Sequence, residues 1–113
     1  MNYITTKFDI KNMYLLFAYN RYYPEGASND FVCKYSSFKE CLEQIIDTST
    51  LKPKTSFTWN EIYDVARDDW HIFYIVNEVK DGAEYFVEIE YTDPDGDTCI
   101  VDEALISEMF EML

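Results

Sequence analysis

The chain has 113 residues, and its 22 aspartates and glutamates against nine lysines and arginines give a formal charge of -13 at pH 7. This charge repels phosphate backbones and anionic membranes, so it argues against direct binding of nucleic acid or membrane and favours a basic protein as partner. Hydrophobic residues make up 48% of the chain and aromatic residues 18%, which excludes the weakly hydrophobic, highly charged class that stays disordered.

The first half of the chain predicts two strands followed by two helices. Residues 13–20 form an apolar and aromatic run typical of a strand, and a loop at 21–30 leads to an antiparallel strand at 31–35. Ser37 and Glu40 form a capping box, so a helix should begin there. Its apolar stripe is Phe38, Cys41, Leu42, Ile45 and Ile46. Thr58 and Glu61 repeat the capping signal, which predicts a second, shorter helix from 59 that ends around 67–69.

From residue 70 onward the apolar residues alternate, which predicts strands, and Asp81-Gly82 favours a two-residue hairpin turn between two of them. In the register set by that turn, one face should form the core. It holds Ile72, Tyr74, Val76 and Glu78 opposite Tyr91, Ile89, Val87 and Tyr85. The other face then carries Glu84, Phe86, Glu88 and Glu90 with Phe73, Ile75 and Asn77.

The last part of the chain predicts a turn, a strand and a helix. The turn at 93–96 leads to a strand at 98–101, in which Val101 should meet Ile89 and Cys99 should meet Tyr91. Asp102 is a suitable N-cap for a final helix, whose stripe must pack on the sheet or on a second copy, in a monomer or a homodimer. The expected fold class is α+β, with a mainly antiparallel sheet, helices packed on one face and the order ββααβββα. We expect one domain over 1–113.

No pattern predicts catalysis, and the expectation is a protein that is not an enzyme and has no cofactor and no metal. His71, the single histidine, has no catalytic partner in a known spacing and is interpreted as a strand histidine packed at a sheet edge. The three cysteines lack zinc-site spacing and are interpreted as buried thiols. No apolar stretch near the N-terminus resembles a signal peptide, so a cytoplasmic location is expected.

The negative charge is concentrated in the second half of the chain. Residues 1–57 carry a net charge of +1, whereas residues 58–113 carry -14 and contain only two basic side chains. Alternate residues of a strand lie about 6.8 Å apart on one face, a spacing comparable with that of successive phosphates. Glu84, Glu88 and Glu90 could therefore imitate a row of phosphates. The row would be extended by Asp93, Asp95 and Asp97 and by Asp64, Asp68 and Asp69.

Two other interpretations of these residues stay open. An acidic surface often serves only solubility, although the lack of interspersed countercharges favours a cationic partner. Asp93, Asp95 and Asp97 resemble the start of a calcium loop, but Thr98 and Ala104 stand where glycine and glutamate are required, so an acidic turn is favoured.

Tyr22 and Tyr23 in the loop at 21–30 either add a recognition patch or fold back over the core.

The segment from Tyr14 to Phe31, followed by Ser37-Phe38, resembles small phage and prophage proteins with a strand, a Tyr-Tyr-Pro-x-Gly loop, an Asn-Asp-Phe strand and a helix. The start of the later strand, Asp69-Trp70-His71-Ile72, is similar to their aromatic strand. The match covers about the first 46 residues and that strand, while the expected second helix and everything after Glu78 depart from it. The resemblance implies a phage-encoded accessory protein acting in the host cytoplasm.

Combined with the acidic second half, this resemblance suggests an anti-defence inhibitor of the anti-CRISPR type. Such a protein would cover the nucleic-acid site of a host nuclease with a surface that imitates nucleic acid. The alternatives are an immunity-type protein that neutralises a basic toxin and a small-molecule binding module that uses the tyrosine-rich loop.

Overall fold

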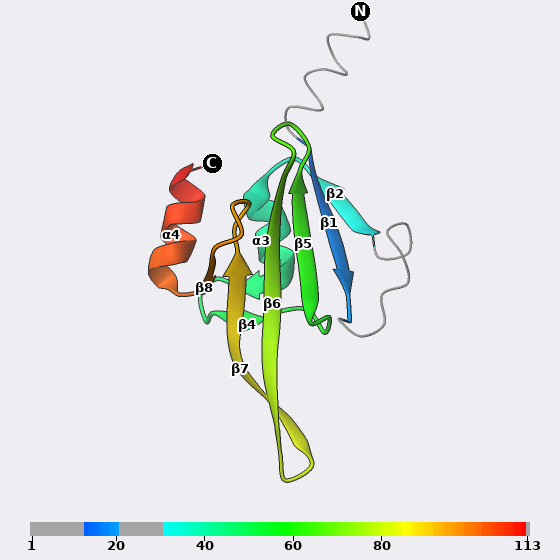
Figure 1. Cartoon of the computed structure of the whole chain (residues 1–113), viewed down its shortest axis with the longest axis vertical. Helices are drawn as coiled ribbons and strands as arrows, with labels where there is room; N and C mark the ends of the chain where they lie inside the picture. The colour runs from blue at the N-terminus through cyan, green and yellow to red at the C-terminus, as the bar shows by residue number, and fades with distance from the viewer. Residues whose placement is uncertain (1–12, 21–30, 113) are drawn as a thin grey trace, which may run out of the picture.

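The computed structural model describes residues 13–20 and 31–112. Six strands form one antiparallel sheet in the order β2-β1-β5-β6-β7-β8 (Figure 1). The strands are β1 (Tyr14–Tyr19), β2 (Phe31–Tyr35), β5 (Trp59–Asp64), β6 (Asp69–Lys80), β7 (Ala83–Thr92) and β8 (Thr98–Ile100). Two short strands, β3 (Ile46–Asp47) and β4 (Lys52–Pro53), pair with each other. Together with the helices α3 (Phe38–Ile45) and α4 (Glu103–Met112), this confirms a mainly antiparallel sheet with two helices.

Helix α3 begins at the predicted cap. The Glu40 amide donates to Ser37 Oγ at 3.1 Å, while the Glu40 carboxylate accepts from Ser36 Oγ instead of reaching back to the cap amide. The predicted stripe is the buried face of the helix, because Phe38, Cys41, Leu42 and Ile45 are all buried. Ile46 continues the same buried run into β3.

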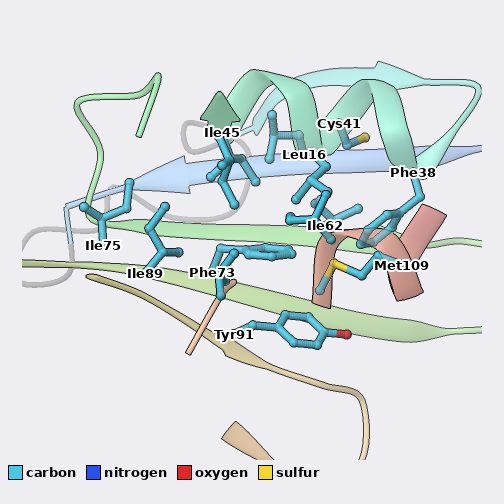
Figure 2. Packing of buried hydrophobic residues seen from close by; sticks show 14 residues of the cluster. Leu16, Phe38, Cys41, Ile45, Ile62, Phe73, Ile75, Ile89, Tyr91 and Met109 are labelled. Carbon is cyan, nitrogen blue, oxygen red and sulfur yellow. The ribbon is translucent and has the colours of Figure 1, made fainter. Parts of the chain in front are cut away.

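The core is one buried cluster of residues from the strands and from both helices (Figure 2). In each central strand alternate residues are buried, as expected for a sheet covered on one side. The buried cluster takes residues from β1, β5, β6 and β7 and from both helices. It consists of Leu16, Phe38, Cys41, Leu42, Ile45, Ile46, Ile62, Phe73, Ile75, Ile89, Tyr91, Val101, Ile106 and Met109.

The segment predicted as a second helix is strand β5, so that prediction is wrong. It pairs with β1 on one side and with β6 on the other, and its burial alternates along 59–64. Trp59, Ile62 and Tyr63 favour strands, and extended backbone between two other strands satisfies their amides and carbonyls. The capping signal of Thr58 and Glu61 is therefore not used, and the order ββααβββα is not the observed one.

The hairpin of β6 and β7 has the predicted turn but a different register in the core. Asp81 and Gly82 both have positive φ, and Glu78 pairs with Tyr85 as predicted. The pairing then skips Val87, so that Val76 meets Glu88 and not Val87. This β-bulge shifts the register by one residue. The core residues of β6 are consequently Phe73 and Ile75, and the predicted core residues Ile72, Tyr74 and Val76 face away from it.

The last elements follow the prediction closely. Tyr91 pairs with Cys99, and the Val101 amide donates to the Ile89 carbonyl, so the register of β8 is confirmed. The Leu105 amide donates to Asp102 Oδ1 at 2.8 Å, which confirms the N-cap of α4. The buried residues Ile106 and Met109 join α4 to the core.

Candidate functional site

The face of the sheet that points away from the core carries most of the features that suggest binding. We call it the open face, because no described helix lies in front of β1, β5 and β6 (Figure 1). Along each strand, the residues of the open face alternate with the buried residues, and they are paired with one another across neighbouring strands. They are Leu15, Phe17, Tyr19, Trp59, Glu61, Tyr63, Trp70, Ile72, Tyr74, Val76, Glu88 and Glu90.

Aromatic side chains form two groups on the open face. Tyr63 and Trp70, paired across β5 and β6, stack with ring centroids 4.5 Å apart, and Phe17 lies 5.7 Å from Trp70. The ring centroid of Trp59 lies 6.4 Å from that of Tyr19 and 5.7 Å from that of Tyr74. Both tryptophans of the chain therefore lie on this face, and 41% of the Trp70 surface is exposed.

Three glutamates share the open face with these aromatic groups. Glu61 is on β5 between Trp59 and Tyr63 in the alternation, and it pairs with Ile72 of β6 and Phe17 of β1. Glu90 pairs with Tyr74, and Glu88 pairs with Val76. All three are partly buried, and within the described residues none has a hydrogen-bond or ion-pair partner.

Glu84 does not belong to this group, which corrects the predicted row of Glu84, Glu88 and Glu90. Glu84 pairs with Val79, as in the predicted register, but the bulge at Val87 places Glu88 and Glu90 on the opposite face of the hairpin from Glu84. It lines a hollow of about 390 Å³ together with Ile75 and Asn77, which are on the core side. Only Glu88 and Glu90 keep the predicted spacing.

The acids of the turn between β7 and β8 are organised by Asp93. Asp93 Oδ1 accepts from the amides of Asp95 and Asp97, at 3.0 and 2.9 Å. Gly96, with a φ of 90°, closes the turn through a hydrogen bond from its amide to the Asp93 carbonyl. The Asp93 carboxylate is thus occupied by the backbone, which is the arrangement expected of an acidic turn.

The acids of the turn between β5 and β6 are in three different environments. Asp64 is only 3% exposed and accepts from the Arg67 amide at 3.2 Å, with its other oxygen 3.9 Å from Arg67 Nε. It is therefore not presented to a partner. Asp68 is exposed, has a φ of 56° and accepts from the Tyr63 hydroxyl, which raises the pKa of Tyr63. Asp69 is partly exposed at the start of β6.

His71 belongs to the core side of the central strand β6, not to a sheet edge. A hydrogen bond of 2.7 Å joins its Nδ1 to the Tyr91 hydroxyl, and its ring packs against Phe38 at 4.8 Å. Burial lowers the pKa of His71, although nearby Asp69, Asp64 and Asp93 oppose this effect. The histidine is thus held neutral in a packed position, which indicates a structural role.

Other features concern ligands and membranes. Among residues 13–20 and 31–112, no three His, Cys, Asp or Glu side chains are grouped so that they could hold a metal ion. Cys41 is buried as predicted, but Cys99 is exposed.

A hollow of about 320 Å³ lies where Tyr14, Phe38 and Phe110 meet, away from the predicted site residues. No helix in the described part of the chain is long and apolar enough to cross a membrane.

The predicted acidic residues therefore do not form one row. Asp68, Asp93, Asp95 and Asp97 lie in the two turns, and Asp69 is the first residue of β6. Glu88 and Glu90 lie on the open face, and Glu84 lies on the other face of the hairpin. Tyr22 and Tyr23 lie outside the described residues. The aromatic groups and Glu61 were not predicted as a site. Their signal was the alternation of Trp59, Glu61 and Tyr63, which the helix prediction concealed.

A comparison with protein families gives one finding. The family model described as Bacteriophage T4 protein Y07C matches residues 14–79, which is more than half of the chain. The matched range runs from β1 to the end of β6 and includes β5, whereas the resemblance noted from the sequence stopped before that segment and resumed at β6. The resemblance to small phage proteins is thereby confirmed. No curated protein and no solved structure matches the chain.

Proposed function

The chain belongs to the bacteriophage T4 protein Y07C family, and from this premise we propose that it is a phage accessory protein that binds a basic protein of the infected cell through the open face. The single observation that carries the proposal is the placement of Glu61, Glu88 and Glu90. These three glutamates are partly buried residues of the open face, paired with Phe17, Val76 and Tyr74 respectively, and they have no ion-pair partner within the described residues.

Electrostatics supports a cationic partner for this face. A carboxylate that is partly removed from water is destabilised unless a positive group or hydrogen-bond donors compensate for the lost solvation. The basic residues that share the face among the described residues are Lys34, at its β2 edge, and Lys80, at the end of the β6–β7 hairpin. A partner that brings arginine or lysine to the middle of the face would supply the missing charge.

The narrower form of the proposal is an anti-defence inhibitor, of the anti-CRISPR type, that occupies the nucleic-acid site of a host nuclease. A nucleic-acid site is a basic surface already shaped to accept rows of negative charge, so an acidic face can compete for it. Glu88 and Glu90, with the turn acids beyond them, supply such charges at strand spacing.

A charge-reversal experiment tests the proposal. The tagged protein is used to capture partners from phage-infected bacterial cells, with E61K/E88K/E90K as the test variant. E84K/E108K/E111K is the matched control, because it makes the same charge change at exposed positions away from the open face. We expect the test variant to lose a partner that the control retains, and we expect the binding of that partner to decrease as salt rises.

Two results decide between the broad and the narrow forms. If both triple variants retain or both lose the same partners, the open face is not the binding surface and the proposal is wrong. If the partner is retained when it is saturated with its own DNA or RNA, the protein does not occupy a nucleic-acid site, and only the broader form survives.

A further inference from the structure

The chemistry of the open face selects among basic partners. We propose that this face binds an extended, arginine-bearing segment of a protein, with one guanidinium stacked on Trp70 and paired with Glu61. This inference rests on the proposed function, because it specifies the partner of the same surface. It commits to arginine rather than lysine and to a chain segment rather than a nucleic acid.

The stacking surface is the indole of Trp70. Its ring is backed by Tyr63 at 4.5 Å and by Phe17 at 5.7 Å, while 41% of the residue surface remains exposed. An exposed indole packed against neighbouring rings offers an electron-rich surface to a cation. A planar cation within about 6 Å of such a ring is attracted by its quadrupole, and arginine is the usual partner.

The carboxylate lies next to this ring. Glu61 pairs with Ile72, which follows Trp70 by two residues on β6, so Glu61 and Trp70 are diagonal neighbours across β5 and β6. Diagonal neighbours on one face are about 7–8 Å apart at Cα, within the reach of long side chains. A guanidinium lying over the indole can therefore turn its edge toward Glu61. A lysine ammonium can make either contact, but it lacks the planar fork that makes both at once.

The order of aromatic and acidic residues on the open face indicates how the partner's extended segment would lie. Along β5 the open face reads Tyr63, Glu61, Trp59, with a step of about 6.8 Å between alternate residues. Beyond this strand, Tyr74 and Glu90 repeat an aromatic ring beside a carboxylate. An extended segment with arginines at alternate positions presents cations at the same interval, so more than one of them can bind.

Two other occupants fit less well. Aromatic rings on a sheet face also suit the stacking of single-stranded bases, but Glu61, Glu88 and Glu90 would repel the phosphates and no described arginine or lysine stands among them. A second copy of the chain would place the same three carboxylates opposite one another, in addition to the charge of -13 on each copy.

The test measures binding of fluorescein-labelled nona-arginine and nona-lysine by anisotropy at about 0.15 M salt, where the attraction between distant charges is weak. We expect nona-arginine to bind about tenfold more tightly than nona-lysine. The W70L and E61Q variants should each weaken nona-arginine binding about five- to tenfold, and E84Q, on the opposite face, less than twofold. E61Q preserves the volume of the side chain, so it remains informative if W70L alters the strand.

Several results would overturn the inference. These are equal affinity for the two peptides, the same effect of E61Q and E84Q, tighter binding of a 15-nucleotide single strand than of nona-arginine, or a dimer whose formation buries the tryptophans. Equal affinity for the peptides, with the infected-cell partner still lost in E61K/E88K/E90K, would refute the arginine contact alone. Loss of no partner in that variant would refute the proposed function itself.

Discussion

Ile75 lies on the core face of β6 and Ile72 on its open face, so replacing each by alanine should lower the unfolding free energy by very different amounts. Ile75 is 4% exposed and pairs with the buried Ile89, whereas Ile72 is partly exposed on the open face. Replacing Ile75 by alanine removes three carbons, or about 2.4 kcal/mol of transfer free energy, and leaves a cavity. We expect a total loss of about 3–4 kcal/mol in unfolding free energy. The I72A variant should lose only about 1.5 kcal/mol, because part of that side chain is already in water and no enclosed cavity is left.

Urea unfolding followed by far-UV circular dichroism measures both values, with the slope m as a check that the unfolded state is unchanged. A difference of about 2 kcal/mol corresponds to a factor of roughly 30 in the folding equilibrium, well above experimental error. If I75A leaves too little folded protein, I75V and I72V give the same comparison at a smaller scale. A larger loss for I72A than for I75A would refute the bulged register and restore the regular one, in which Ile72 faces the core.

Three further predictions concern local features. S37A should lower the unfolding free energy by about 1 kcal/mol in chemical denaturation, since the Glu40 amide loses its acceptor, whereas no loss would mean that the cap is not formed. Burial lowers the pKa of His71 below its unfolded value, so the folded state binds fewer protons and its stability should fall as pH decreases through about 6.5. Thermal melts at pH 5–8 should show this decrease in the wild type and a smaller one in H71Q. G96A should cost about 1 kcal/mol from its φ of 90° alone, because nothing lies within 4 Å of the added methyl group; an unchanged midpoint would contradict the strain.

The features predicted correctly are those set by short-range contacts. The Ser37 cap, the Asp81-Gly82 turn and the Asp102 cap each depend on hydrogen bonds or backbone angles within a few residues. The register between β7 and β8 could also be predicted, because the short turn at Asp93–Gly96 determines it and no bulge intervenes. Contacts within a few residues were sufficient to predict these features, because none of them depends on pairing with a strand that is distant in the sequence.

The two errors in the sheet, the helix at 59 and the regular hairpin, have causes that are not local. Segment 59–64 holds Trp59, Ile62 and Tyr63 at helical spacing, and the strand buries the polar Asn60 and Asp64 beside Ile62. The decision for a strand comes from pairing with β1 and β6 on its two sides. Val87 is a β-branched residue of the kind that is common in regular strands, so nothing in its identity marks a bulge. Packing of Phe73 and Ile75 against the core selects the shifted register.

These errors hid the candidate site. With the segment that begins at 59 taken as a helix, Trp59, Glu61 and Tyr63 could not be placed beside Trp70 and Tyr74 on one face. With a regular hairpin, Glu84 was aligned with Glu88 and Glu90, although the bulge separates them. The concentration of charge in the second half was visible from the sequence, but its distribution over two faces and two turns required the fold.

The most direct test of the central claim is a titration of the isotope-labelled protein with nona-arginine, followed by two-dimensional NMR. Both tryptophans lie on the open face, so their indole N–H signals report on it specifically. We expect the largest shifts at the Trp70 indole and at the amides of Glu61, Tyr63 and Ile72. Shifts confined to the turn acids at 93–97 and to α4, with unchanged indole signals, would contradict the claim that this face is the binding surface.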